Sequence, residues 1–282
     1  MKRKLGCMAM AAVLSLSLAA CGSGEKPAVT ESPAAGTETT AAGTETPAPA
    51  EAAPADGGTV ANKDKPLVWF NRQPSSSATG QLDMTALNYN KDTYYVGFDA
   101  NQGAELQGTM VKDYIEQNID AIDRNGDGII GYVLAIGDIG HNDSIARTRG
   151  VRKALGTGIE KDGNINSEPV GTNTDGTAPA VQDGTLEVNG KQYIVRELAS
   201  QEMKNSAGAT WDAATAGNAI GTWSSSFGDQ IDIVVSNNDG MGMSMFNAWS
   251  KDNEVPTFGY DANSDAVAAI AEGYGGTISQ HA

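Results

Sequence analysis

The chain has 282 residues, of which 35 are acidic and 19 are basic, so its formal net charge at pH 7 is −16. This negative excess excludes nucleic acid and anionic surfaces as expected partners. It suits a soluble exported protein that attracts cations.

The first 20 residues have the pattern of a signal peptide. Residues 2–4 give a basic start, and 8–20 is an apolar run that is too short to span a bilayer. The Leu-Ala-Ala-Cys sequence at 18–21 matches a bacterial lipoprotein signal. We therefore expect Cys21 to be lipidated and to anchor the mature chain on the outer face of the cell membrane, or in the periplasm. The alternative is an ordinary secreted protein with one stray cysteine. Because Cys7 is removed with the signal, no disulfide within one chain is expected.

Residues 22–64 consist mainly of Gly, Ser, Thr, Glu, Pro and Ala. Such a segment cannot offset its ordering entropy by burying apolar side chains. Residues 21–64 are therefore expected to be a disordered tether that carries the lipid on Cys21 and holds a folded domain clear of the membrane.

Residues 65–282 are long enough for one α/β domain. Short apolar runs predict buried strands, and apolar positions at helical spacing predict helices between them. Because strands alternate with helices, the expected fold class is α/β with a mostly parallel, doubly wound sheet. In chain order, we expect strands at 67–70, 94–97, 131–136, 231–235 and 256–260, and helices at 102–119, 143–155, 211–223, 241–249 and 264–271.

The stretch 156–192 interrupts this alternation because it is rich in Gly, Asn, Asp and Thr. Within and after it, 185–188 and 191–195 flank Asn189 and Gly190, which predicts a hairpin with a type I′ turn. We interpret the stretch as an insertion before the next strand.

Polar side chains follow the expected strands repeatedly, and parallel sheets bind ligands at the carboxyl ends of their strands. Each of these side chains alone is a common helix cap, and Asp143 with Arg147 makes an ordinary i,i+4 pair. Together they form a ring suited to vicinal hydroxyls, which donate to carboxylates and accept from guanidinium or amide groups. Trp211 is either a cover for the C–H face of a sugar or a core residue. The ring consists of Asn71, His141, Asp143, Arg147, Asn237, Asn238, Asp239 and Asp261.

The loop from 123 to 129 is spaced like an EF-hand calcium loop. Position 12 of such a loop is a glutamate, but here it is Leu134, so a remote carboxylate must complete the ligand shell. The alternative is a plain Asn/Asp/Gly turn. Two histidines without a cysteine pattern make zinc an unsuitable ion. The matching oxygen donors and glycine are Asp123, Asn125, Asp127, Gly128 and the carbonyl of Ile129.

The sequence gives little support to the interpretation that this protein is an enzyme. The sequence has no Gly-x-Ser-x-Gly, no Walker loop and no dinucleotide fingerprint that follows a strand and opens a helix. His141 and Asp143 would be the acid–base pair of a sugar-processing enzyme, but no partnered nucleophile accompanies them. We expect a binding protein and not an enzyme.

These residues resemble the periplasmic galactose/glucose-binding proteins, which are substrate receptors of sugar ABC importers and, in some bacteria, of chemotaxis. The resemblance runs from about Pro66 to Ala282. Its motifs are Val68-Trp69-Phe70-Asn71, Tyr94-Tyr95-Val96-Gly97, the 123–131 loop, Gly140-His141-x-Asp143-x-x-x-Arg147, Trp211-Asp212, Asn237-Asn238-Asp239-x-Met241-x-Met243 and Phe258-Gly259-x-Asp261.

The resemblance implies a type I periplasmic-binding-protein fold that encloses galactose or glucose between two lobes. It implies a permease as partner, a monomeric chain, and a membrane contact through the lipid anchor alone. Trp211 would stack on the pyranose. The side chains that would hydrogen-bond the sugar are Asn71, His141, Asp143, Arg147, Asn238, Asp261 and Gln280.

The same resemblance implies a Ca²⁺ site. Asp232 falls where the family has the remote glutamate that closes the shell. Gly131 falls where the family has a side-chain ligand, so a water would substitute there. The remaining ligands would be Asp123, Asn125, Asp127 and the carbonyl of Ile129.

The family has several strand–helix units before the strand at 67–70 and continues past the last expected strand. The resemblance therefore implies that 65–93 is a remnant of the first lobe and that 94–282 is the second lobe. Faces that the absent elements cover should be exposed, and sugar binding should be weak or absent. Alternative readings are a surface calcium-binding or adhesive module, and a defective gene product without sugar transport.

Overall fold

The computed structural model describes residues 63–75, 82–161, 164–165 and 181–279. The predicted signal peptide, Cys21, nearly all of the tether and Gln280 lie outside these residues. All of the described residues belong to one compact unit, Glu45–Ala282. Among them, no helix has the length and apolar character that crossing a membrane requires.

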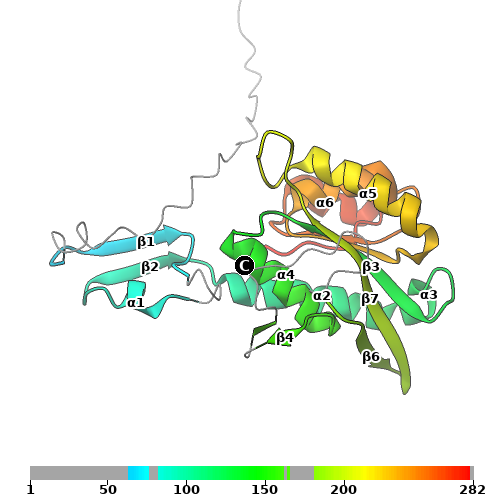
Figure 1. The fold of residues 1–282 in the computed structure, drawn as a ribbon, viewed down its shortest axis with the longest axis horizontal. Coiled ribbons are helices and arrows are strands. Elements are labelled where there is room, and N and C mark those ends of the chain that lie inside the picture. The colour runs from blue at the N-terminus through cyan, green and yellow to red at the C-terminus, as the bar shows by residue number, and fades with distance from the viewer. Residues whose placement is uncertain (1–62, 76–81, 162–163, 166–180, 280–282) are drawn as a thin grey trace, which may run out of the picture. The chain divides into compact units, whose positions relative to one another are not determined.

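The main sheet has five strands in the order β6-β7-β3-β8-β9 (Figure 1). The central strand β3 pairs in parallel with β7 and with β8, and β8 pairs in parallel with β9. Only β6 is antiparallel to its neighbour. The strands are β3 (Ile129–Ile136), β6 (Gly184–Val188), β7 (Lys191–Glu202), β8 (Ile233–Ser236) and β9 (Thr257–Phe258).

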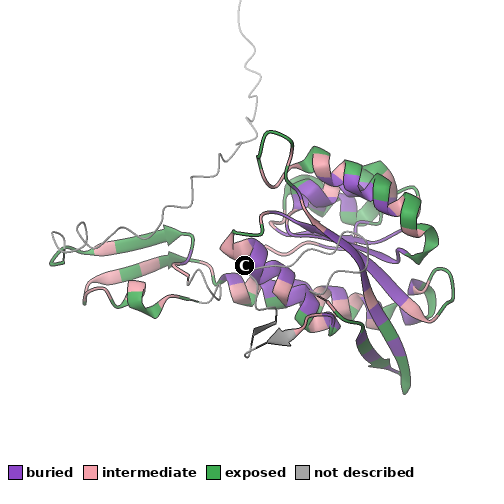
Figure 2. Ribbon diagram, in the orientation of Figure 1, coloured by how far each residue is buried: buried purple, intermediate pink, exposed green. Residues whose placement is uncertain are grey.

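Helices cover both faces of this sheet, which gives the predicted three-layer α/β architecture (Figure 1). Side chains alternate along β3, so Tyr132 and Leu134 join one core with α2 and α4, while Val133 and Ala135 join the other with α5 and α6. Figure 2 shows β3 almost continuously buried between these layers, whereas the β6–β7 hairpin end of the sheet has exposed residues. The helices are α2 (Ala100–Gln117), α3 (Ile119–Ile122), α4 (Asn142–Leu155), α5 (Ala213–Phe227), α6 (Asp239–Met245) and α7 (Ser264–Ala269).

Several predicted boundaries differ from the structure. Trp211 precedes α5, which extends to Phe227. The helix predicted at 241–249 is α6 followed by a π-helical turn, Phe246–Ser250, and the one at 264–271 is α7 followed by a 3₁₀ turn, Ile270–Glu272. A 3₁₀ turn, Gly228–Gln230, also follows α5.

The predicted hairpin is present, but its second arm is longer than expected. Asn189 and Gly190 have φ of 54° and 76°, the left-handed pair that a type I′ turn requires. Strand β7 continues past Val195 to Glu202 and lies beside β3 as an inner strand of the sheet. A β-bulge interrupts this pairing, because Tyr132 faces Glu197 while the next residue, Val133, faces Ala199. The hairpin therefore belongs to the main sheet. Within the stretch read as an insertion, β4 (Glu160–Lys161) pairs with β5 (Asn164–Ile165).

A second, two-stranded parallel sheet contains β1 (Leu67–Asn71) and β2 (Thr93–Gly97). The short helix α1 (Met84–Leu87) lies between these strands in the sequence. The strands at 67–70 and 94–97 form as predicted, but the prediction that they are buried is wrong. Phe70 is 76% exposed and its partner Val96 is 65% exposed. Within the part of the chain that the structure describes, these two strands pair with each other alone, and apolar side chains on their faces are uncovered, as the resemblance led us to expect.

Candidate functional site

Arg147 is the centre of the candidate site. It projects from α4, and its side chain is 5% exposed. Nη1 donates to the carbonyl of Asn237 at 2.7 Å and lies 3.4 Å from Oδ1 of Asp261, while Nη2 lies 4.0 Å from Oδ2 of Asp143. The guanidinium stacks on the Tyr260 ring, 3.7 Å from its centroid. Two carboxylates and an aromatic face therefore hold one buried cation at the carboxyl ends of β3, β8 and β9.

The third nitrogen of this guanidinium differs from Nη1 and Nη2 in its contacts. Nε of Arg147 is buried and has no hydrogen-bond acceptor among the described residues. A buried N–H without an acceptor is costly, and a hydroxyl or ring oxygen of a ligand supplies one. The predicted role of Arg147 as a donor to a polar ligand is consistent with this geometry.

His141 is the N-cap of α4, and its Nδ1 accepts from the backbone N–H of Asp143 at 3.1 Å. Burial lowers the pKa of His141 below its ordinary value, although the nearby Asp143 carboxylate opposes this shift. The imidazole meets the Trp211 ring edge to face, with centroids 5.3 Å apart. His141 is thus both a helix cap and part of the wall around Arg147.

Trp211 has φ of 59°, in the left-handed region, directly before α5. Its backbone N–H donates to the carbonyl of Gly137 at 3.1 Å, and its indole lies where a Cβ on Gly137 would be. The ring centroid is 5.8 Å from the Arg147 guanidinium. The indole packs against the core between β3 and α5 and is only partly buried. Its packing role is therefore observed, and its role as a cover for a sugar stays a prediction.

Asn237 and Asn238, which follow β8, have different hydrogen-bonding roles. The Asn238 side chain caps α6 by accepting from Met241 N–H at 2.9 Å. The buried Asn237 accepts from Gly137 N–H at 3.1 Å and donates to Thr148 at 3.2 Å, besides accepting from Arg147. Asn237 therefore ties β3, α4 and β8 together beneath the site.

Two further predicted sugar residues either have no described side-chain contact with the site or cannot be placed. Asn71 ends β1 with φ of 66°, and no contact between its side chain and the residues around Arg147 is described. Gln280 lies outside the described residues. The structure thus brings together His141, Asp143, Arg147, Trp211 and Asp261.

Three residues that the sequence did not single out support this end of the sheet. The Tyr260 ring stacks on Arg147, and Thr277 accepts from the backbone N–H of Ala262 at 3.0 Å. Gln107 is fully buried in α2 and donates to the carbonyls of Ser236 and Gly259 at 2.8 and 3.0 Å. The sequence offered one indication of the role of Gln107. It is a polar residue on the apolar stripe of a predicted helix, between Ala104 and Val111, where a buried glutamine needs hydrogen-bond partners.

The candidate calcium loop folds on itself through its own backbone. Asp123 accepts from the N–H groups of Gly126 and Gly128 at 2.8 and 2.9 Å, and Asp127 accepts from Ile129 N–H at 2.8 Å. Asn125 donates to Asp127 at 3.0 Å. These contacts are those of an Asn/Asp/Gly turn, and the same oxygen types are suitable ligands for Ca²⁺.

Asp232 reaches this loop from the start of β8, although it is distant in sequence. Its two oxygens accept from the N–H groups of Arg124 and Gly131 at 2.9 and 2.7 Å. Burial raises the pKa of Asp232 to about 7. Within the described part of the chain, no three His, Cys, Asp or Glu side chains are close enough to hold a metal. The donor types suit calcium, but the loop is not arranged as a metal cluster.

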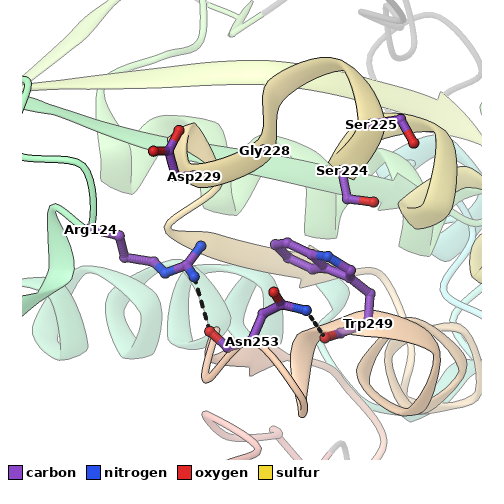
Figure 3. A pocket seen from close by; sticks show the side chains of 7 residues that line it. All are labelled: Arg124, Ser224, Ser225, Gly228, Asp229, Trp249 and Asn253. Carbon is purple, nitrogen blue, oxygen red and sulfur yellow. Dashed lines mark hydrogen bonds between the residues drawn. The ribbon is translucent and has the colours of Figure 1, made fainter. Parts of the chain in front are cut away.

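A separate hollow of about 280 Å³ lies beside this loop, between the end of α5 and the π-helical turn (Figure 3). The guanidinium of Arg124 is 6.0 Å from the Trp249 ring centroid and donates to the Asn253 carbonyl at 3.1 Å. None of the predicted sugar-binding residues lines it. The remaining lining residues are Ser224, Ser225, Gly228 and Asp229.

Comparison with known families identifies the chain's class. The model of the periplasmic binding protein domain matches residues 61–282. The chain belongs to this family. It is a family of substrate-binding proteins and not of enzymes, so the acid–base reading of His141 and Asp143 has no support from it.

Two curated proteins are similar to this member of the family. The chain is 28% identical over 218 residues to the D-galactose/methyl-galactoside binding periplasmic protein MglB of Haemophilus influenzae, covering 77% of this chain and 51% of that protein. It is 25% identical over 296 residues to the xylitol-binding protein of Mycolicibacterium smegmatis, covering 96% and 73%. The chain thus spans about half the length of the first relative.

A solved periplasmic solute-binding protein from Actinobacillus succinogenes 130z, with bound D-allose, is 18% identical to this family member. The match covers 76% of this chain and 57% of that one, with a TM-score of 0.47.

Proposed function

We propose that this chain is the substrate-binding component of a sugar ABC importer and that it binds galactose or glucose. The observation that carries the proposal is the buried Arg147, which lies between the carboxylates of Asp143 and Asp261. A hexose offers neighbouring hydroxyls that donate to such carboxylates while their oxygens accept from the guanidinium.

The rest of the wall suits the same ligand. Trp211 provides a partly exposed indole against which the C–H face of a pyranose packs. His141, held neutral by burial, presents Nε2–H because its Nδ1 accepts from the backbone. Asn71 and Asn238 remain candidate ligands from the strand-end pattern and the resemblance, and Gln280 remains one from the resemblance alone. The choice of galactose rests on the motifs and on the similarity to MglB, whose name states that it binds D-galactose and methyl-galactoside.

The proposal includes three further parts. A permease is the partner that receives the sugar, and a lipid on Cys21 holds the chain at the membrane. A calcium ion at the 123–129 loop stabilises the lobe, with Asp123, Asn125, Asp127, the Ile129 carbonyl and Asp232 as ligands. Asp232 supports this part because it contacts the loop through Arg124 N–H.

Titration calorimetry of the purified chain with galactose and with glucose tests the binding proposal. We expect saturable heat and a change in tryptophan fluorescence at millimolar sugar, and their loss in Arg147→Met. Arg196→Met, which removes an exposed guanidinium paired with Asp183, is the matched control and should bind as the parent does. Absence of heat and fluorescence change at millimolar concentrations of both sugars contradicts the proposal.

A further inference from the structure

Two adjacent residues at the candidate sugar site have a backbone that side chains rarely adopt. Asp261 has φ of 107° and Ala262 has φ of 53°, and neither is a glycine. Such conformations persist only where the surrounding structure holds them, and they are common at ligand sites. In this conformation the Asp261 carboxylate faces the candidate site, with its Oδ1 3.4 Å from Nη1 of Arg147.

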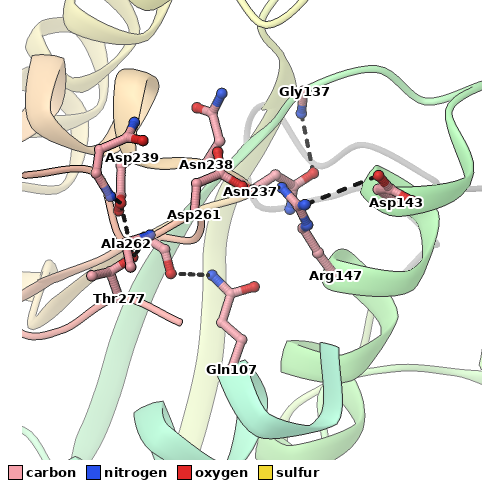
Figure 4. A network of polar contacts seen from close by, with 12 residues as sticks. Gln107, Gly137, Asp143, Arg147, Asn237, Asn238, Asp239, Asp261, Ala262 and Thr277 are labelled. Atoms are coloured by element: carbon pink, nitrogen blue, oxygen red, sulfur yellow. Dashed lines mark hydrogen bonds and ion pairs between the residues drawn. The ribbon is translucent and has the colours of Figure 1, made fainter. Parts of the chain in front are cut away.

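The contacts that hold this turn converge on Asp239 (Figure 4). Its backbone N–H donates to the carbonyl of Tyr260 at 2.8 Å, just before the strained pair. Its Oδ2 accepts from Asn263 N–H at 2.9 Å, just after the pair, and from the Thr277 hydroxyl at 2.8 Å. The oxygen of Thr277 in turn accepts from Ala262 N–H at 3.0 Å.

Asp239 is itself fixed in place. It is fully buried, and its Oδ1 accepts from the Tyr274 hydroxyl at 3.2 Å. Gly259 packs against the same carboxylate so closely that a Cβ there would collide with Asp239 and with Tyr274. A carboxylate confined in this way is a rigid acceptor, unlike an exposed helix cap.

We propose that Asp239 and Thr277 are positioning residues of the sugar site. They hold Asp261 and Ala262 in the left-handed conformation, so that the Asp261 carboxylate faces Arg147. Neither residue touches the sugar in this proposal. The inference rests on the proposed function, because it assigns to Asp261 the role of a sugar ligand.

The first test compares galactose affinity in three variants. Thr277→Val keeps the shape of the side chain but removes the hydroxyl, whereas Thr277→Ser keeps the hydroxyl. We expect a loss of roughly tenfold in the first and recovery to within about twofold in the second, because small misplacements of a site residue are costly. Thr222→Val removes an exposed hydroxyl of α5 and is the matched control, with unchanged affinity.

The second test needs no sugar. NMR coupling constants and backbone chemical shifts report φ at Asp261 and Ala262 in the parent chain and in each variant. We expect Thr277→Val to lose the positive φ at Ala262 and Thr277→Ser to keep it. Asp239→Asn, which keeps the size of the side chain, provides the same measurement if Thr277→Val does not fold.

The outcomes separate the two proposals. If Thr277→Val lowers the melting temperature but leaves both φ and the galactose affinity unchanged, the residues are merely structural and the inference is overturned. If φ changes in Thr277→Val while the parent chain itself binds neither sugar, the turn is held as inferred and the proposed function fails.

Discussion

The guanidinium of Arg152 in α4 and the carboxylate of Glu197 in β7 form a fully buried, two-point ion pair. Nε lies 2.8 Å from Oε2 and Nη2 lies 2.8 Å from Oε1. The Tyr132 hydroxyl donates to Oε2 at 2.9 Å, and Nη2 also donates to Ser200 at 3.2 Å. The pair therefore connects the helix that carries Arg147 to the two central strands.

Removing one partner of this pair should be strongly destabilising. We expect Arg152→Met to lower the free energy of unfolding by about 3–5 kcal/mol, because Glu197 is then buried without a counter-charge. Urea unfolding followed by circular dichroism measures this loss. Arg196→Met breaks an exposed pair with Asp183 and should cost less than about 1 kcal/mol. Equal, small losses in both variants would contradict the argument.

Two glycine-to-alanine changes should have opposite signs. In Gly137→Ala the new Cβ meets the Trp211 indole, so we expect a loss of about 1–3 kcal/mol in stability and a changed fluorescence spectrum. In Gly221→Ala, inside α5, the Cβ meets nothing within 4 Å, and we expect a gain of about 0.5–1 kcal/mol. Urea unfolding of both variants measures the two changes in stability. A loss of stability in Gly221→Ala would contradict an open, helical position for Gly221 in α5.

His141 should make the chain less stable in mild acid. Its pKa is lowered in the folded chain, chiefly by burial, so the unfolded chain takes up the proton first as the pH falls. The stability contributed by neutral His141 is complete above a pH of about 6.5 and is lost as the pH falls through that value towards the folded pKa. Asp232, whose pKa is raised to about 7, contributes to the same pH range with the opposite sign. We therefore expect His141→Asn, which keeps an N-cap acceptor, to remove only the loss of stability towards acid that His141 causes. Melting temperatures between about pH 5 and pH 8 measure it, and an identical slope in the variant would exclude His141 as the source.

The proposed calcium ion should raise the melting temperature of the chain, since a ligand that binds only the folded state stabilises it. We expect Asp123→Asn to remove most of this shift, because it removes a carboxylate from the proposed shell. Asp120→Asn, on the exposed side of the preceding α3, is the control and should keep the full shift. Differential scanning fluorimetry with calcium and with a chelator gives the readout. No shift in the parent chain would leave the loop as an Asn/Asp/Gly turn.

The order of strands and helices was predictable because each element carries a local signal. The continuous apolar run at 132–135 fits a strand buried on both faces, and Asn189-Gly190 specifies the turn between β6 and β7. The full length of β7 was not predictable, because Arg196, Glu197 and Ser200 are unusual in an inner strand. Glu197 is acceptable there only because Arg152, which is remote in sequence, neutralises it.

The candidate site also contains residues that the sequence could predict and residues that it could not. His141, Asp143 and Arg147 are close in sequence, so one helix start brings them together, and this could be anticipated. The contribution of Thr277 could not, because it depends on a hydrogen bond to Ala262 and another to Asp239 across the fold. The bare β1–β2 sheet was anticipated only through the resemblance, since Leu67–Phe70 reads locally as a buried strand.

The bulge in β7 explains how both Glu197 and Ser200 reach the same guanidinium. Residues three apart on a regular strand point to opposite faces of the sheet. Here Leu198 and Ala199 are consecutive yet join the same core, on the α5 side, so the in–out pattern of the strand changes phase between them. Glu197 before the change and Ser200 after it therefore both face α4 and contact Arg152. Leu198 is thus the one extra residue that separates Glu197 from Ala199, and deleting it would leave a regular strand in which Glu197, Ala199 and Ser200 keep the layers that they have here.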